Sequence, residues 1–130
     1  MIVRTLDEIL NTDRDIKLPG HNSNSRRLLL QKDGMGFTLT DTIINAGADN
    51  LVWYKNHVEA CYCLEGEGEV EVLGSEPKTY QIKPGTMYAP DKHDKHKIRV
   101  RKTLRLICVF VPPLTGREVH DADGTYSAPE

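Results

Sequence analysis

The chain has 130 residues, 38% hydrophobic and 28% charged, which suits a single globular domain over residues 1–130 with one core. Its 17 Lys and Arg residues nearly balance its 19 Asp and Glu residues, so no overall field attracts nucleic acid or a membrane surface. No apolar run reaches the roughly 18 residues of a spanning helix, and the first residues lack a secretory signal pattern, so we expect a cytoplasmic protein.

The predicted elements begin with one short helix. Thr5 and Glu8 have the spacing of a capping box, which predicts a helix over about 6–12 within an N-terminal helical segment of about residues 1–15. After it, short apolar or β-branched runs alternate with turn signals. The runs are RLLLQ, FTLTDTII, LVWY, ACYCL (which ends at a turn signal, Glu65-Gly66), EVEVL, TYQI, KIRV and LRLICVFV. Eight or nine short strands of this kind predict an all-β sandwich or barrel.

The later runs indicate which strands are central in the sheet and which expose one face to solvent. Charges alternate with Val or Ile in EVEVL and KIRVR, as in strands that pack on one side only. The run 104–111 is nearly all apolar and is expected to be central. The basic stretch 92–105 lacks interleaved aromatic residues, so a solvent-facing strand explains it better than a nucleic-acid site. Residues 121–130 are expected to form a flexible tail unless a ligand or partner orders them.

The three cysteines, Cys61, Cys63 and Cys108, are an odd number, and two of them form a C-x-C inside a strand pattern. This arrangement argues against a disulfide framework and against a zinc knuckle. We expect free, buried thiols in a reducing compartment. Cys61 and Cys63 share a strand face with Glu59, so both point into the barrel if Glu59 does.

The strongest chemical signal is a spacing. The first motif of cupin barrels has the form G-x5-H-x-H-x3-E-x6-G, and at those offsets this chain has Gly47, Trp53, Lys55, Glu59 and Gly66. The carboxylate and both glycines remain, and both histidines are replaced. The second cupin motif places a His eleven residues after its first Gly, which is the separation of Gly85 and His96. The chain therefore resembles a cupin-type β-barrel, or jelly roll, with half of the usual metal site.

Two ligands rarely hold a catalytic metal, so a third is expected. Tyr88 is the candidate, because it follows Pro84-Gly85 and enters the strand that leads to His96. A phenol ionises near neutrality only beside a cation. The set of Glu59, Tyr88 and His96 is hard to borderline and suits Fe2+ better than a thiolate-preferring metal, while Zn2+ and Mn2+ stay open.

Longer stretches resemble the ectoine synthases nearly end to end. They are MIVRTLDEI, MGFTLT, YKNHVEACYCLEGEGEVEVL, IKPGTMYAPDKHDKH and CVFVPPLTGREVHDADGTY. The resemblance implies a cupin homodimer with iron on Glu59, Tyr88 and His96, and a small-molecule substrate. It also implies a pocket lined by Arg27, Thr42, Tyr54, His57, Asp91, His93, Phe110, Glu118 and His120.

The reaction implied by the resemblance is ring closure of N-γ-acetyl-L-2,4-diaminobutyrate to ectoine with loss of water, so the enzyme is a hydro-lyase. We hypothesise that Glu118 and His120 together accept the proton of the attacking amine. Tyr54 is expected to orient the substrate or to protonate its oxygen. Arg27 is a candidate clamp for the substrate carboxylate, because its fork matches that group.

Three positions depart from the common family pattern: Ser23 replaces a Trp, Thr40 an amide or imidazole, and Pro90 a Leu. These departures concern the substrate side rather than the metal. They leave two alternatives open: a non-catalytic cupin that binds or senses a small molecule, and an enzyme acting on a related N-acyl diamino acid.

Overall fold

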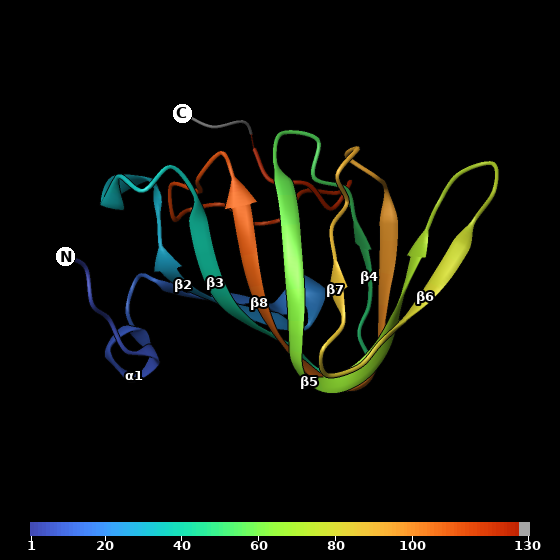
Figure 1. Ribbon diagram of the computed structural model, residues 1–130, viewed down its shortest axis with the longest axis horizontal. Coiled ribbons are helices and arrows are strands. Elements are labelled where there is room, and N and C mark those ends of the chain that lie inside the picture. Colours follow the sequence, from blue (N-terminus) through green and yellow to red (C-terminus); the bar gives the residue numbers. More distant parts are fainter. Residues whose placement is uncertain (128–130) are drawn as a thin grey trace.

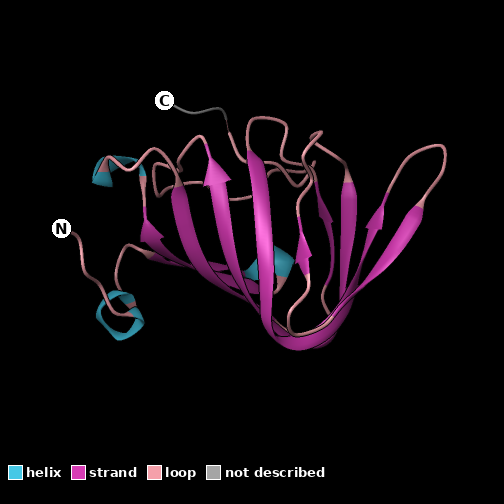
Figure 2. Ribbon diagram, in the orientation of Figure 1, coloured by secondary structure: helices cyan, strands magenta, loops and turns pink. Residues whose placement is uncertain are grey.

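The structure is a computed structural model that describes residues 1–127. Strands dominate it, and the helical pieces are short (Figure 2). In chain order the elements are α1 (Leu6–Ile9), β1 (Asp15–Leu18), η1 (Pro19–His21), β2 (Ser23–Leu29), η2 (Gln31–Asp33), β3 (Thr38–Ile44), β4 (Asp49–Val52), β5 (Val58–Val72), β6 (Lys78–Ile82), β7 (Met87–Tyr88) and β8 (His96–Val111).

All eight strands belong to one antiparallel sheet with the order β1-β2-β3-β8-β5-β6, while β4 pairs with β8 and β7 pairs with β5. The sheet curls, so that its strands rise on two sides of a trough and the long strands β5 and β8 bend through its base (Figure 1). The predicted all-β fold is confirmed, and β8 is central in the sheet as the apolar run 104–111 indicates.

The strands differ from the expected set of short ones, because β5 and β8 are 15 and 16 residues long. The sequence predicts a turn at Glu65-Gly66, but β5 continues through this point with shifts in its register against β8. Gly66 has a φ of 96°, and a Cβ there would collide with the carbonyl oxygen of Thr103. Without a side chain, the strand forms a bulge and bends instead of turning back, which curls the sheet.

The helix is shorter than predicted. Thr5 and Glu8 form the expected capping box, but α1 ends after Ile9 rather than at residue 12. Asn11 adopts a φ of 62°, and its N–H donates to the Asp15 carboxylate at 2.8 Å. This left-handed residue turns the chain into β1, which begins within the expected helical segment.

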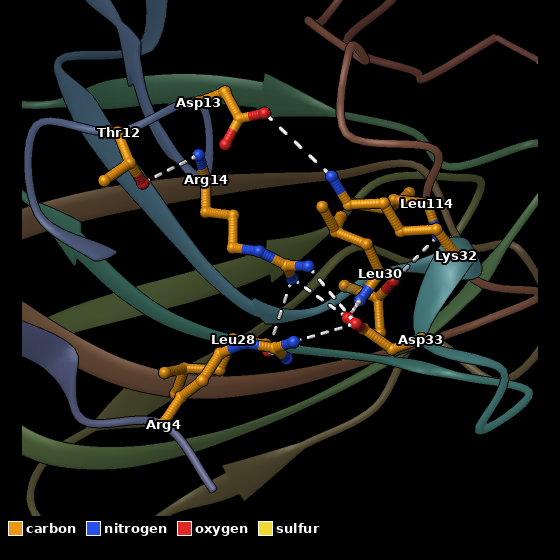
Figure 3. A network of polar contacts seen from close by, with 10 residues as sticks. Arg4, Thr12, Asp13, Arg14, Leu28, Leu30, Lys32, Asp33 and Leu114 are labelled. Atoms are coloured by element: carbon orange, nitrogen blue, oxygen red, sulfur yellow. Dashed lines mark hydrogen bonds and ion pairs between the residues drawn. The ribbon is translucent and has the colours of Figure 1, made fainter. Parts of the chain in front are cut away.

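An ion cluster fastens the N-terminal segment to the sheet (Figure 3). Arg4 and Arg14 donate to the Asp33 carboxylate at 3.0 and 2.9 Å, and the Leu30 N–H donates to it at 2.9 Å. The Arg14 guanidinium, with these other donors, holds the pKa of Asp33 well below its usual range despite the opposing effect of burial. Charged groups and backbone donors together favour the ionised carboxylate.

The inner and outer faces of β8 differ as the period-two pattern predicts. Ile98, Val100 and Leu104 are buried in the single core cluster. On the outer face, Arg99 pairs with Glu69 and Glu71 of β5. The basic stretch is therefore a solvent-facing strand whose charges are partly matched across the sheet. Within residues 1–127, the one helix is far too short to cross a bilayer.

The C-terminal segment is packed, which differs from the expected flexible tail. Tyr126 is only 2% exposed and belongs to the core. The carbonyl of Gly124 accepts the Trp53 N–H at 3.0 Å, and the Thr125 hydroxyl accepts the Lys55 N–H at 2.9 Å. Residues 121–127 thus follow the rim of the trough beside the end of β4, and the rest of the predicted tail, 128–130, lies outside the described residues.

Candidate active site

A cavity of about 50 Å³ lies inside the curled sheet. Side chains from β2, β3, β4, β5, β7, β8 and the C-terminal segment line it. Seven of the twelve site residues expected from the sequence are among them: Thr42, Tyr54, Glu59, Tyr88, His96, Phe110 and His120. The fold therefore brings together residues that are up to 78 positions apart in the chain, from Thr42 to His120.

One wall of the cavity carries the three expected metal ligands. Glu59 lies on β5, Tyr88 on β7 and His96 at the start of β8, and the β5–β7 register pairs Tyr88 with Cys61. Burial raises the pKa of Glu59 to about 7, although the thiols of Cys61 and Cys108 partly oppose this by donating to it. Burial also raises the pKa of Tyr88 well above 10. A nearby cation would reverse both effects, because it favours the anionic forms.

His96 is oriented as a ligand. Its Nδ1 lies 2.8 Å from the carbonyl oxygen of Asp94, and because a carbonyl only accepts, Nδ1 carries the hydrogen. The lone pair is then on Nε2, which is buried and has no hydrogen-bond partner. A backbone carbonyl that fixes the tautomer in this way is typical of metal-bound imidazoles. The residues present therefore fit a divalent cation.

Two thiols lie beside these three residues in the cavity lining. Cys61 and Cys108 line the cavity, and their sulfur atoms lie 3.3 Å apart. These sulfurs and a Glu59 carboxylate oxygen all lie within 4.8 Å of one another. Strand parity predicts that Cys61 faces the same side as Glu59, and this is confirmed, whereas Cys63 does not line the cavity. All three cysteines are free and buried, as predicted.

The cavity lining also holds a hydrogen-bonded pair. The Tyr54 hydroxyl lies 2.7 Å from Nε2 of His120. Burial raises the pKa of Tyr54 well above 10. Burial lowers the pKa of His120 to about 3, with further contributions from the charges of His21 and Arg27. Near neutral pH both groups are therefore uncharged, and each is able to give or take a proton.

Two aromatic residues that the sequence analysis did not select hold His120 between them. The His21 ring stacks on the His120 ring with centroids 3.8 Å apart, and the Tyr126 ring stacks on it at 4.5 Å. Both residues line the cavity. His21 ends η1 and Tyr126 lies in the C-terminal segment, so no periodic pattern could have indicated either one.

Arg27 and Glu118 are buried next to the cavity but do not line it. Arg27 donates from Nη2 to the Glu118 carbonyl at 2.8 Å, and its guanidinium lies 5.7 Å from the Tyr126 ring centre. The Glu118 carboxylate accepts the N–H groups of Thr115 and Gly116 at 2.7 and 2.9 Å. Burial raises the pKa of Glu118, but these N–H groups lower it further, so that the net shift is downward.

The remaining three expected residues also lie outside the cavity lining. His57 is buried with neither ring nitrogen paired, and its ring meets those of Phe110 and Tyr126 edge-on. His93 donates from Nδ1 to the Tyr54 carbonyl at 2.8 Å, which ties its loop to the cavity wall. Asp91 lines a second, larger groove of about 600 Å³, and Tyr88 and His96 border both spaces.

A curled antiparallel sheet that surrounds a cavity, with candidate metal ligands in the cavity lining, defines a cupin-type barrel. The comparisons with known proteins narrow this class. The family model described as ectoine synthase matches residues 1–130. The L-ectoine synthase of Desulfatibacillum aliphaticivorans is 59% identical over 126 residues, which cover 97% of this chain and 96% of the relative. The chain belongs to the ectoine synthase family.

Solved structures agree with this assignment. The crystal structure of ectoine synthase from P. lautus is 61% identical, with a TM-score of 0.87, and the match covers 100% of this chain and 93% of that one. A crystal structure of FeII HppE has a TM-score of 0.68 at 18% identity, over 85% of this chain and 60% of that one. The second likeness concerns the fold alone.

The three positions that depart from the family pattern lie in two places, at the cavity and at the larger groove. Ser23 lines the cavity, next to His21. Thr40 is fully buried, and its hydroxyl lies 2.8 Å from that of Thr42. Pro90 lines the groove. Two of the three departures therefore lie at or directly behind the cavity wall.

Proposed function

We propose that the cavity is the active site at which this chain closes N-γ-acetyl-L-2,4-diaminobutyrate to ectoine. As a member of the ectoine synthase family, the chain is a hydro-lyase. In the reaction, the α-amine nitrogen bonds to the acetamide carbon, and the carbonyl oxygen leaves as water with the two amine protons. The observation that carries the proposal is the cavity itself, whose lining contains both an unpaired His96 Nε2 and the Tyr54–His120 pair.

Glu59, Tyr88 and His96 are the proposed metal ligands. Carboxylate, phenolate and imidazole donors favour Fe2+, and Zn2+ or Mn2+ are the alternatives. When bound, the cation supplies Lewis acidity toward the substrate carbonyl. The buried Glu59 carboxyl, with a pKa raised to about 7, supports this role, because an uncompensated carboxylate is unfavourable in such surroundings.

His120 and Tyr54 are the proposed proton carriers. The amine must lose protons as it attacks, and the oxygen must gain them before it leaves. His120 is neutral at physiological pH, since its pKa is lowered to about 3, so its ring has a lone pair available. The Tyr54 hydroxyl, 2.7 Å from that ring, is placed to relay a proton toward the leaving oxygen.

Arg27 and Glu118 are proposed to act from behind the Tyr126 ring. Arg27 has one buried nitrogen, Nη1, without a hydrogen-bond partner, which supports a role in attracting the substrate carboxylate. Glu118 stays in the proposal as the second group of the amine's proton path. Its ion pair with Arg27 at 3.9 Å also supports a role in holding that arginine in place.

The other substrate contacts fall into two groups. Thr42 and Phe110 line the cavity and are proposed to contact the substrate directly. His57 and His93 pack behind its aromatic wall, and Asp91 lies at the groove. We propose that these three act once substrate binding widens the cavity. A volume of about 50 Å³ holds only about three or four water molecules, so an acetylated diamino acid requires the walls to move.

The test is turnover by the purified full chain loaded with Fe2+, with ring formation followed by chromatography. We expect product that disappears with chelator. His96→Ala should lose both bound metal and turnover, whereas Glu118→Gln should keep the metal and lose turnover. Tight binding of the substrate without product would instead favour the small-molecule sensor. Metal loss in Glu118→Gln would move that residue into the ligand set.

An enzyme acting on a related N-acyl diamino acid is the second candidate. The observation that favours it is that Ser23, which departs from the family pattern, lines the cavity together with His21. Competition between the acetyl substrate and its propionyl or formyl analogues distinguishes the two. The larger kcat/KM identifies the preferred acyl group.

We also propose a homodimer in the cytoplasm. Ile2, Val3 and Met87 are 44%, 79% and 61% exposed, and apolar side chains of this kind suit a contact with a second copy. Three free thiols suit a reducing compartment. Light scattering during gel filtration should give the dimer mass, and Val3→Asp should shift it toward the monomer.

A further inference from the structure

The thiols on the cavity wall form a feature that the proposed reaction does not use. Cys61 and Cys108 are directly opposed in the β5–β8 register. Their side chains are 1% and 2% exposed and line the cavity. Cys63 differs, because its sulfur donates to the Glu65 carbonyl and does not line the cavity.

The separation of the two sulfurs, 3.3 Å, distinguishes between their possible roles. It is about 1.2 Å longer than a disulfide bond of about 2.05 Å. It is about 0.5 Å shorter than the roughly 3.8 Å that separates two sulfurs bound at about 2.3 Å to one tetrahedral zinc ion. A small rotation of either side chain therefore brings the pair to the spacing of two metal ligands.

A third donor is already present. A Glu59 oxygen lies within 4.8 Å of both sulfurs, so two sulfurs and one oxygen surround a common point on the wall. All three residues are buried, and the cavity beside them leaves room for water as a fourth ligand. This arrangement has the ligand types and number of a site with one open position.

We propose that Cys61, Cys108 and Glu59 form a second cation site that binds thiophilic divalent metals such as Zn2+ and Cd2+. When the cation binds, each sulfur releases its proton to solvent and bonds to the metal as a thiolate. Thiolate ligands select such metals over Mn2+, which prefers oxygen donors. The site therefore differs in chemistry from the Glu59, Tyr88 and His96 set, although the two share Glu59.

Because both sites use the Glu59 carboxylate, a cation at the thiol site should compete with the catalytic metal. This part of the inference rests on the proposed function. A cation held by the thiols occupies Glu59, so the set containing His96 loses one of its three ligands. Thiophilic metals should therefore displace the catalytic metal rather than bind beside it.

The test uses the full metal-free chain under anaerobic conditions, titrated with Cd2+ in the presence of excess Mn2+. Two readouts are followed: ultraviolet thiolate-to-cadmium charge transfer, and bound cadmium by equilibrium dialysis. We expect one Cd2+ per chain with the absorption of two thiolates. Cys61→Val and Cys108→Val, which keep core volume, should each weaken binding by at least about 100-fold.

Two control variants make the result specific. Cys63→Val should keep the full signal, because the Cys63 sulfur donates to the Glu65 carbonyl and does not line the cavity. His96→Ala should also keep the charge transfer, which separates this site from the proposed catalytic set even when turnover is absent. A signal unchanged in both Cys61→Val and Cys61→Ser, or cadmium bound without charge transfer, would overturn the inference. Circular dichroism verifies that each variant is folded.

Discussion

At the scale of single residues, the site depends on polar groups that burial keeps neutral. The His120 ring lies between His21 and Tyr126 and bonds to the Tyr54 hydroxyl. Its pKa is lowered to about 3 because burial disfavours the charged imidazole and because His21 and Arg27 add to that effect. Neutrality gives the ring a lone pair for catalysis, but it also makes the folded state sensitive to acid.

The pH dependence of stability tests this neutrality. The folded pKa of His120 is below the unfolded value of about 6.5, so the unfolded chain binds a proton that the folded chain does not. Stability is therefore lost as pH falls below about 6.5, and the loss continues toward pH 3. At pH 5 the contribution of this group is about 2 kcal/mol. Urea unfolding of the wild type and of His120→Gln should show a steeper loss between pH 7 and pH 5 in the wild type, and parallel curves would contradict the prediction.

The Tyr54 hydroxyl offers a second test at this scale. Tyr54→Phe removes the proposed proton relay and keeps the ring that packs on Phe110. We expect kcat to fall by about 100-fold with little change in bound metal. Tyr62→Phe, on the exposed face of the same sheet, is the matched control and should retain wild-type kcat.

At the scale of elements, the C-terminal segment completes the cavity. Gly124 has a φ of 75°, and a Cβ at this position would collide with the Leu51 carbonyl oxygen. Because no side chain intervenes, the segment lies directly on the end of β4 and delivers Tyr126 to the stack on His120.

Gly124→Ala should therefore detach this segment while the sheet stays folded. The variant adds both backbone strain and a collision with Leu51. Gly34→Ala is the matched control, since Gly34 has a φ of 76° but nothing within 4 Å of the added Cβ. We expect faster tryptic cleavage at Arg117 and altered fluorescence of Trp53 in Gly124→Ala only. Equal effects in both variants would show that strain alone is responsible.

Most features of the strands could be predicted from the sequence, but the length of one strand and two residues of the cavity lining could not. Strand positions and faces followed from period-two patterns, and parity placed Glu59, Cys61 and Cys63 on one face. The length of β5 did not follow, because Gly66 has the local signature of a turn, and its bulge depends on the approach of Thr103 from a strand far along the chain. His21 and Tyr126 were missed for a similar reason. Their place in the cavity depends on tertiary packing, which has no periodic signal.

At the scale of the whole molecule, ion clusters join segments that are distant in the chain. Asp33 holds Arg4 and Arg14 against η2 (Figure 3), and Asp41 of β3 pairs with Arg26 of β2 and Arg105 of β8. Both carboxylates are nearly buried. Removing one partner from either cluster should therefore lower the free energy of unfolding more than breaking an exposed ion pair would.

Asp33→Asn tests the contribution of the first cluster. The change leaves two partly buried guanidinium groups without a counter-charge, so we expect a loss of about 1 to 3 kcal/mol in the free energy of unfolding. Since the folded pKa of Asp33 is depressed, the wild-type advantage should be complete above about pH 4 and disappear in stronger acid. Asp13→Asn is the control, because its contact with Lys32 is exposed and 3.9 Å long, and it should change stability by less than about 0.5 kcal/mol.

The central position of β8 has a consequence for biosynthesis. This strand is the last of the sheet to be translated, yet β3, β4 and β5 all hydrogen-bond to it. On a nascent chain, the edges of these three strands that face β8 therefore stay unpaired until residues 96–111 have left the exit tunnel. Completion of the sheet must await β8, and unpaired strand edges exposed during that interval are substrates for chaperones.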